Sequence, residues 1–377
     1  MKRLKSIDIF RGLCMAWMIL THLIDWWLKN DYSSINSFTK MIFDPIGASG
    51  FLFISGISIT LSYRNKIIET SKFNQLNPSI IRNTYILRAF FIFAIAIIYN
   101  ILISLSLNDL TWIWTWYVLL TTAVSLIITL PLLKTSRIFR ISFGFIVMIL
   151  NQILVSLLLE YEGEANLYGL IFHILYHDIH QDPILTFYPF FLFGTVVGDT
   201  IFNVFYTNQN EKIENRVLRY KDLFLLLVIG ILFIILGVFI SFPKFLNRRT
   251  FSWIIYALGI ELTLFSVLLI FEILNLINTE KSYKLLFYYS YYSFTLYVSH
   301  NLLYFLFLNR LNPINIWFFI TATFFAIGLL FRAIYKRWGG ILSIKVQISK
   351  ISKKISLIIY EKTYNNPIRK KFDEGTD

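Results

Sequence analysis

The chain has 377 residues, of which 56% are hydrophobic, 18% aromatic and 15% charged, and its formal net charge is +13. A soluble domain carries about 25% charged residues, and with this many aromatic side chains it would expose large apolar patches. Composition therefore excludes a soluble protein and predicts an integral, multi-pass membrane protein. Basic loops on one membrane side explain the positive charge better than nucleic acid does, so we expect no nucleic-acid partner.

Apolar stretches separated by polar breaks predict an all-α polytopic transmembrane helix bundle of about 10 spans, with 10–11 as the range. Alternating basic loops place both termini in the cytoplasm. One loop violates this charge rule, because Lys244, Arg248 and Arg249 fall on the outer side. For a prokaryotic source we expect the cell (plasma) membrane. The expected spans are 7–28, 44–63, 84–106, 112–132, 139–159, 184–205, 222–241, 251–277, 284–308 and 314–335.

The sequence divides into a membrane domain at 1–335 and a basic cytoplasmic tail at 336–377. Isoleucines in the tail recur at alternating steps of three and four residues, from Ile341 to Ile358. That spacing predicts an amphipathic helix on the anionic inner leaflet, with membrane lipids as partners. A partly disordered basic tail is the alternative.

The first span carries a polar stripe. Arg11 and His22 are eleven residues apart, so they are nearly eclipsed and roughly 16 Å apart along the helix axis. Charged groups in a span usually face the bundle interior or a cavity. The stripe suits a long, flexible substrate, with Arg11 meeting phosphate, His22 acting as general base and Asp25 orienting its ring. The alternative is structural: Asp8 pairs with Arg11, and His22 hydrogen-bonds a neighbour. The residues on this face are Asp8, Arg11, Met15, Met18, His22, Asp25 and Lys29.

Several segments resemble, in order, the heparan-α-glucosaminide N-acetyltransferase family and, more distantly, other membrane acyltransferases. The similarity covers about residues 3–335. The segments are RLKSIDIFRG at 3–12, FLFISGISITLS at 51–62, ILRAFFIF at 86–93, YPFFLFGTVVGD at 188–199, FPKFLNRRTFSWIIYALG at 242–259 and YYSFTLYVSHNLLYF at 291–305.

The resemblance implies a membrane acyltransferase that moves an acetyl group from cytosolic acetyl-CoA to an amine or hydroxyl of an extracytoplasmic sugar or glycan, without a metal. It also implies a catalytic histidine in the outer loop at 29–43. This sequence has no histidine there, so the role must pass to another residue, and His22 matches the first-span histidine of the wider acyltransferase families. Direct transfer and an acetyl-His22 intermediate both remain open, as does a homodimer. The alternative function is a multispan transporter or flippase of a small anionic or lipid-linked substrate.

Further residues are candidates for donor binding and for catalysis. We expect Arg88 and Arg64 to join Arg11 and Asp8 around acetyl-CoA, because guanidinium groups suit phosphate. Ordinary inner-side charge is the alternative for Arg64. His300 is expected near the depth of His22, where it could donate a hydrogen bond to the oxyanion. An interhelical hydrogen bond is the structural alternative for His300.

The outer side offers candidates for the acceptor. Of the polar residues in the loop before 184–205, we expect His180 and Asp182 to contact the acceptor and no metal to bind, although their spacing would allow one. Glu261 lies near the bilayer centre, where an ionisable group is a candidate for substrate binding or for a structural ion pair. Trp26 and Trp27 are interpreted as interface anchors. The polar loop residues are His173, His177, Asp178, His180 and Asp182.

Overall fold

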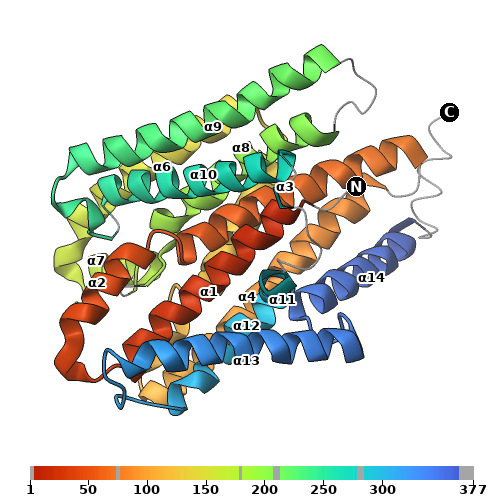
Figure 1. Ribbon diagram of the computed structural model, residues 1–377. Helices are drawn as coiled ribbons and strands as arrows, with labels where there is room; N and C mark the ends of the chain where they lie inside the picture. The colour runs from red at the N-terminus through yellow and green to blue at the C-terminus, as the bar shows by residue number, and fades with distance from the viewer. Residues whose placement is uncertain are drawn as a thin grey trace.

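The fold is a bundle of long helices (Figure 1). In the computed structural model, the described part of the chain contains no β-strand. The described residues are 4–73, 77–177, 181–206, 213–248, 250–274, 276–277 and 284–364. The long helices are α1 (Lys5–Trp27), α3 (Ala48–Phe73), α4 (Pro78–Leu107), α5 (Val118–Leu132), α6 (Arg137–Leu158), α8 (Ile184–Tyr206), α9 (Ile213–Ile240), α10 (Phe251–Ile273), α13 (Asn315–Trp338) and α14 (Ile344–Tyr364).

Within the described residues, nine helical stretches are long and apolar enough to cross a membrane. They coincide with nine of the predicted spans, so the all-α polytopic fold is confirmed. We call the end of the bundle where α1 begins the inner end and the opposite end the outer end; Figure 1 shows the inner end on the right. Two short helices lie at the outer end: α2 (Ser33–Phe43) and α7 (Leu167–Leu175).

The stretch expected as one span at 284–308 is broken into three short helices. At the inner end, Ser290 Oγ donates to Asp8 over 2.9 Å, and at the outer end Trp27 Nε1 donates to the Leu303 carbonyl over 2.9 Å. The stretch therefore follows α1, but the prediction of one continuous helix is wrong because the helix breaks at Tyr292. The pieces are α11 (Lys284–Tyr291), α12 (Ser293–Ser299) and the 3-10 helix η5 (His300–Phe305).

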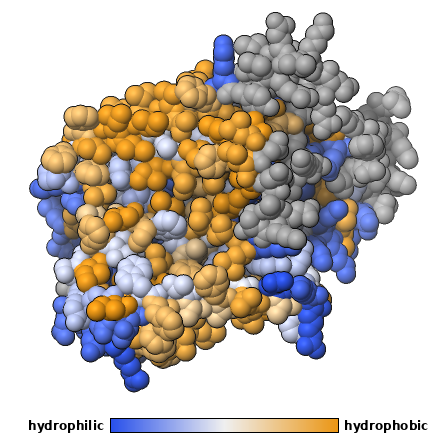
Figure 2. Space-filling view, viewed as in Figure 1, coloured by the Kyte–Doolittle hydropathy of each residue, from blue (hydrophilic) through white to orange (hydrophobic). Residues whose placement is uncertain are grey.

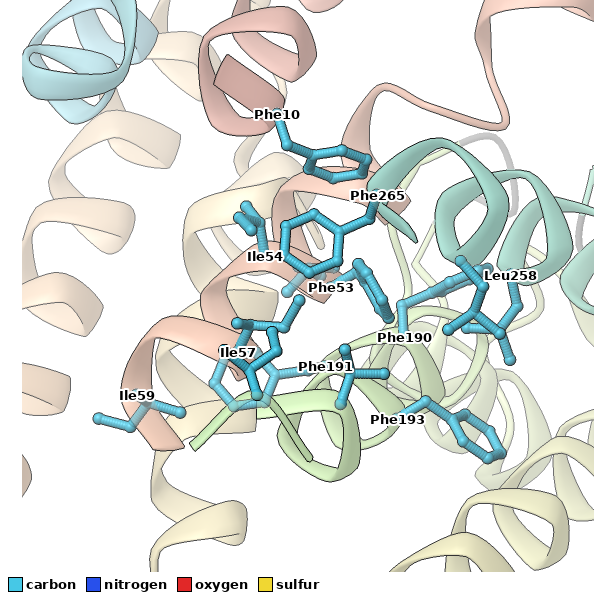
Figure 3. Packing of buried hydrophobic residues seen from close by; sticks show 14 of the residues in the cluster. Phe10, Phe53, Ile54, Ile57, Ile59, Phe190, Phe191, Phe193, Leu258 and Phe265 are labelled. Carbon is cyan, nitrogen blue, oxygen red and sulfur yellow. The ribbon is translucent and has the colours of Figure 1, made fainter. Parts of the chain in front are cut away.

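An aromatic cluster joins α1, α3 and α10 on the inner side of the bundle (Figure 3). Phe10 meets Phe265 edge to face at 5.4 Å between ring centroids, and Phe53 lies 6.1 Å from both rings. Edge-to-face pairs contribute about 0.5–1.5 kcal/mol each beyond area burial. This cluster fixes the position of α1 relative to α3.

Helices α3 and α8 cross at glycines. A Cβ added to Gly56 would overlap the carbonyl oxygen of Phe191, and a Cβ added to Gly194 would overlap the carbonyl oxygen of Phe53. Small residues let helix backbones approach this closely inside a membrane. The crossing explains two of the family-like motifs, because 51–62 and 188–199 are the two surfaces that meet.

Apolar side chains cover much of the surface between the two ends (Figure 2). Phe239 on α9 is 79% exposed, and Phe318 on α13 is 71% exposed. In a soluble protein such a surface would be an aggregation or docking patch, whereas in a membrane protein it faces lipid.

The helix found in the tail, α14, packs along α4. Ser356 Oγ donates to the Ile80 carbonyl over 2.8 Å, and Ile348 and Ser352 are buried on the same face. Ile358, one of the expected apolar stripe, is 42% exposed. The face turned to α4 therefore combines serine with isoleucine, while the placement of α14 on the inner leaflet stays a prediction.

Candidate active site

A cavity of about 450 Å³ lies near the outer end, and we call it the outer cavity. Its walls come from α1, α2, α3, α5 and α12, from the residues just before α8 and from the segment before α10. Its lining includes a histidine, five charged side chains and, from α12, a tyrosine. These residues are His22, Asp25, Lys40, Asp44, Asp182, Arg248 and Tyr297.

The structure brings together the two histidines that the sequence placed at similar depth. The ring centroids of His22 and His300 are 5.0 Å apart. Trp26 stacks on both, at 5.0 Å from His22 and 5.7 Å from His300, with interplanar angles of 21° and 20°. Trp26 therefore contacts both histidines, and its role as an interface anchor stays a prediction.

His300 is fixed by its own helix. Its Nδ1 lies within hydrogen-bond distance of the carbonyl oxygen of Tyr297. A carbonyl only accepts, so Nδ1 carries the proton and Nε2 of the neutral ring is an acceptor. The oxyanion-donor role expected for His300 would therefore require the protonated imidazolium.

Asp25 is engaged by α2 rather than by His22. Its Oδ1 accepts hydrogen bonds from Lys40 Nζ and Asn36 Nδ2, each at 2.7 Å. No hydrogen bond joins Asp25 to His22 in the part of the chain that the structure describes. The arrangement therefore lacks the aspartate–histidine bond of a triad, and the role of Asp25 in orienting His22 stays a prediction.

Arg248 closes a second ion-pair group in the outer cavity. It lies 2.7 Å from Asp182 and 3.4 Å from Asp44, and its guanidinium stacks over the Phe187 ring at 5.2 Å. This arginine belongs to the loop that violated the charge rule, and the ion pairs give the physical reason for that exception. Asp182 lines the outer cavity as expected, and its contact with an acceptor stays a prediction.

A second, smaller cavity of about 130 Å³ lies towards the inner end, and we call it the inner cavity. Three cations line it, Arg11, Arg88 and Lys345, whereas no carboxylate is among its lining residues. Arg11 Nη2 donates to Ser58 Oγ. Arg88 lies 5.8 Å from the Tyr85 ring centroid, and its buried Nε has no hydrogen-bond partner among the described residues.

The two cavities lie end to end along the same helices. Both are lined from α1, α3, α5 and α12, so each of these helices passes from one cavity to the other. Met15, on the same face of α1 as Arg11 and Met18, is 1% exposed and lines neither cavity. On three helices, a residue of the inner cavity lies within three positions of a residue of the outer cavity. These pairs, inner residue first, are Phe51 and Ala48 on α3, Leu119 and Val118 on α5, and Phe294 and Tyr297 on α12.

Three expected site residues lie elsewhere in the described part of the chain, and a fourth lies outside it. Asp8 accepts a hydrogen bond from Ser290 and does not line the inner cavity. Arg64 lies in a third cavity. Glu261 is fully buried on α10 and lines neither the inner nor the outer cavity. His180 lies outside the described residues, and within the described ones no group of three His, Cys, Asp or Glu could hold a metal ion.

Sequence reasoning missed several residues of these cavities. Lys40 lies in the segment 29–43, in which only a histidine was expected as a site residue. Arg248 was signalled by its violation of the charge rule. Lys345 belongs to the predicted tail, which was expected to have no role in the site. Nothing in the sequence of the tail signals that α14 packs along α4.

A comparison with known protein families identifies the family of this chain. The family described as Heparan-alpha-glucosaminide N-acetyltransferase, catalytic, matches residues 3–230. The match covers more than half of the chain and includes α1 to α8. It confirms the family resemblance and spans the four motifs up to residue 199, whereas the motifs at 242–259 and 291–305 lie beyond it. No curated protein matches the chain significantly. The chain therefore belongs to the heparan-α-glucosaminide N-acetyltransferase catalytic family, and it is a multi-pass membrane acetyltransferase.

Proposed function

We propose that the chain transfers an acetyl group from acetyl-CoA, held in the inner cavity, to an amine or hydroxyl of a sugar held in the outer cavity. The observation that carries this proposal is the end-to-end arrangement of the two cavities along α1. Arg11 lines one and His22 lines the other. With the inner end in the cytoplasm, as the basic loops predict, the acetyl group would cross the membrane within one bundle.

The inner cavity suits the donor because it is narrow and positively charged. A volume of about 130 Å³ is below the usual range for small-molecule sites, about 300–1,000 Å³, so the cavity holds only part of acetyl-CoA. The thin pantetheine arm fits such a space, with the nucleotide at the mouth. Arg88 and Lys345 would bind the donor's phosphates, since charge-assisted hydrogen bonds to guanidinium and ammonium groups are strong.

The chemistry would take place beside His22. The nitrogen or oxygen of the acceptor attacks the thioester carbonyl, and His22 removes its proton as the new bond forms. The carbon–sulfur bond then breaks, and the leaving CoA thiolate takes a proton back from the imidazolium. Trp26 stacks on the rings of His22 and His300, so the ring of His22 needs no large reorientation between accepting and returning the proton. Transfer through an acetyl-His22 intermediate uses the same groups.

The outer cavity suits a sugar. Its volume of about 450 Å³ lies within the usual range for small-molecule sites, about 300–1,000 Å³. The Asp25–Lys40 pair and the Arg248 group offer hydrogen-bond donors and acceptors to several hydroxyls. Three carboxylates against two cations disfavour a strongly anionic acceptor. These features support an amine or hydroxyl acceptor of a glycan.

The test is labelled acetyl transfer by purified protein. Acetyl-CoA labelled in the acetyl group is incubated with a panel of amino and neutral sugars, and free CoA and acetylated sugar are both measured. We expect transfer by wild type, none by His22→Ala, and near wild-type transfer by His173→Ala, which removes a histidine from α7 outside both cavities. Folded wild type that releases no CoA with any sugar would overturn the proposal and favour a transporter.

A further inference from the structure

We propose that a third cavity, at the inner end of the bundle, is a binding site for a phosphate group. The cavity has a volume of about 330 Å³ and lies between α3, α6 and α8. The phosphate would come from a lipid headgroup or from a free phosphate compound, and the two sources are separated by the experiment below. The lining residues are Arg64, Thr135, Ser136, Arg137, Arg140, Asp199, Phe202 and Asn203.

One carboxylate serves two guanidinium groups in this cavity. Arg64 Nε lies 2.9 Å from Asp199 Oδ1, and Arg140 Nη2 pairs with Asp199 Oδ2. Arg140 is fully buried and Asp199 is 4% exposed. Burying charges is costly unless they are compensated, and a single arginine would have sufficed for Asp199.

A third guanidinium adds to this excess. Arg137 Nη2 donates to the backbone carbonyl of Asp199 over 3.1 Å, which supplies no negative charge. The Nε of Arg140 is also buried, and in the described part of the chain it has no hydrogen-bond partner. A buried donor without a partner costs about 1–3 kcal/mol, and more for a charged group. An anion in the cavity would supply both the charge and the acceptor.

The start of α6 contributes in the same direction. The helix begins at Arg137 with Ser136 as its N-cap, whose Oγ accepts from the Phe139 amide over 3.1 Å. Helix N-termini carry partial positive charge and bind phosphate through backbone amides. Arginine's planar fork also suits phosphate oxygens. The shape and charge of the cavity therefore fit a phosphate rather than a neutral ligand.

This site is separate from the donor cavity. The two cavities share none of their lining residues. Arg64 lies six residues beyond Ser58 on α3, which is about 9 Å further towards the inner end. The proposal therefore does not depend on acetyl transfer, and an inactive His22 variant would leave it untouched.

The experiment measures phosphate binding to the full-length protein in detergent. Thermal unfolding is followed while inorganic phosphate is titrated, with potassium chloride at matched ionic strength as reference. In a second arm, native mass spectrometry counts phosphatidylglycerol and phosphatidylcholine molecules that remain bound. Arg137→Gln removes the guanidinium that has no carboxylate partner among the described residues. Lys134→Gln is the matched control, because it removes the same charge from the same turn but does not line the cavity.

We expect phosphate to stabilise wild type more than chloride does, and Arg137→Gln to raise the Kd by about tenfold (about 1.4 kcal/mol), with Lys134→Gln unchanged. Retention of phosphatidylglycerol that Arg137→Gln abolishes would identify a lipid headgroup, whereas phosphate stabilisation without lipid retention would identify a free phosphate compound. Folded wild type that shows neither effect would overturn the proposal, and so would equal losses in the two variants. The wild-type result decides even where Arg137→Gln fails to fold.

Discussion

Replacing Arg88 by glutamine tests the inner cavity as the donor site. Glutamine keeps much of the length of the side chain but removes the charge and the fork of N–H donors. In the structure the guanidinium contacts the Tyr85 ring at 5.8 Å, and its buried Nε has no partner among the described residues. Its hydrogen-bonding capacity is therefore left for a ligand.

The expected magnitude follows from these contacts. A hydrogen bond between charged groups is worth about 1.5–3 kcal/mol, so the Kd for acetyl-CoA should rise about 10- to 150-fold. The fold loses only a cation–π contact of about 0.5–1 kcal/mol, and it no longer buries an unpartnered cation. We therefore expect the Tm to stay within about 3 °C of wild type.

The assay is calorimetric titration of acetyl-CoA into detergent-purified protein, with thermal unfolding of the same samples. Arg82→Gln is the matched control, because Arg82 is an exposed arginine on α4 six residues earlier and does not line the inner cavity. A Kd within threefold of wild type in a folded Arg88→Gln protein would refute the assignment of the donor site. Equal weakening by Arg82→Gln would show that only the general surface charge matters.

Three further outcomes are expected. Gly56→Ala should lower the free energy of unfolding by about 1–3 kcal/mol, because its Cβ would overlap a backbone carbonyl of α8. Gly47→Ala is the control, because its Cβ meets nothing closer than 3.9 Å. Equal Tm values for Gly56→Ala and wild type in thermal melts would show that the helix crossing is looser. Lys345→Gln should weaken acetyl-CoA binding by about fivefold or more. Lys350→Gln, which changes an exposed lysine on the same helix, should leave the affinity unchanged. Equal affinities of the two variants for acetyl-CoA would show that α14 does not contribute to the donor site. Asp25→Asn should lower kcat less than about fivefold, because Asp25 Oδ1 is bonded to Lys40 and Asn36 and a partly exposed ion pair is worth about 0–1 kcal/mol. A loss of a hundredfold or more would instead support the predicted role of Asp25 in orienting His22.

The sequence alone determined the class of fold and the helix face along which the candidate site lies. Apolar length predicted nine of the spans correctly, because crossing a bilayer imposes the same length on every helix. The stripe on the first span also followed from local geometry, since a period of 3.6 residues decides which residues share a face. Arg11 and His22 accordingly line two cavities along one face of α1.

Tertiary structure decided which residues meet across that axis. His300 comes beside His22 in a stretch, 284–308, where the expected ninth span breaks at Tyr292, and no glycine or proline in that stretch signals the break. Asp25 pairs with Lys40 because α2 lies against α1, a contact that helix periodicity does not encode. Lys345 reaches the inner cavity because α14 packs along α4. Periodicity is a property of one helix, whereas these contacts depend on how separate helices pack, and that is set by the summed shape and charge of distant segments.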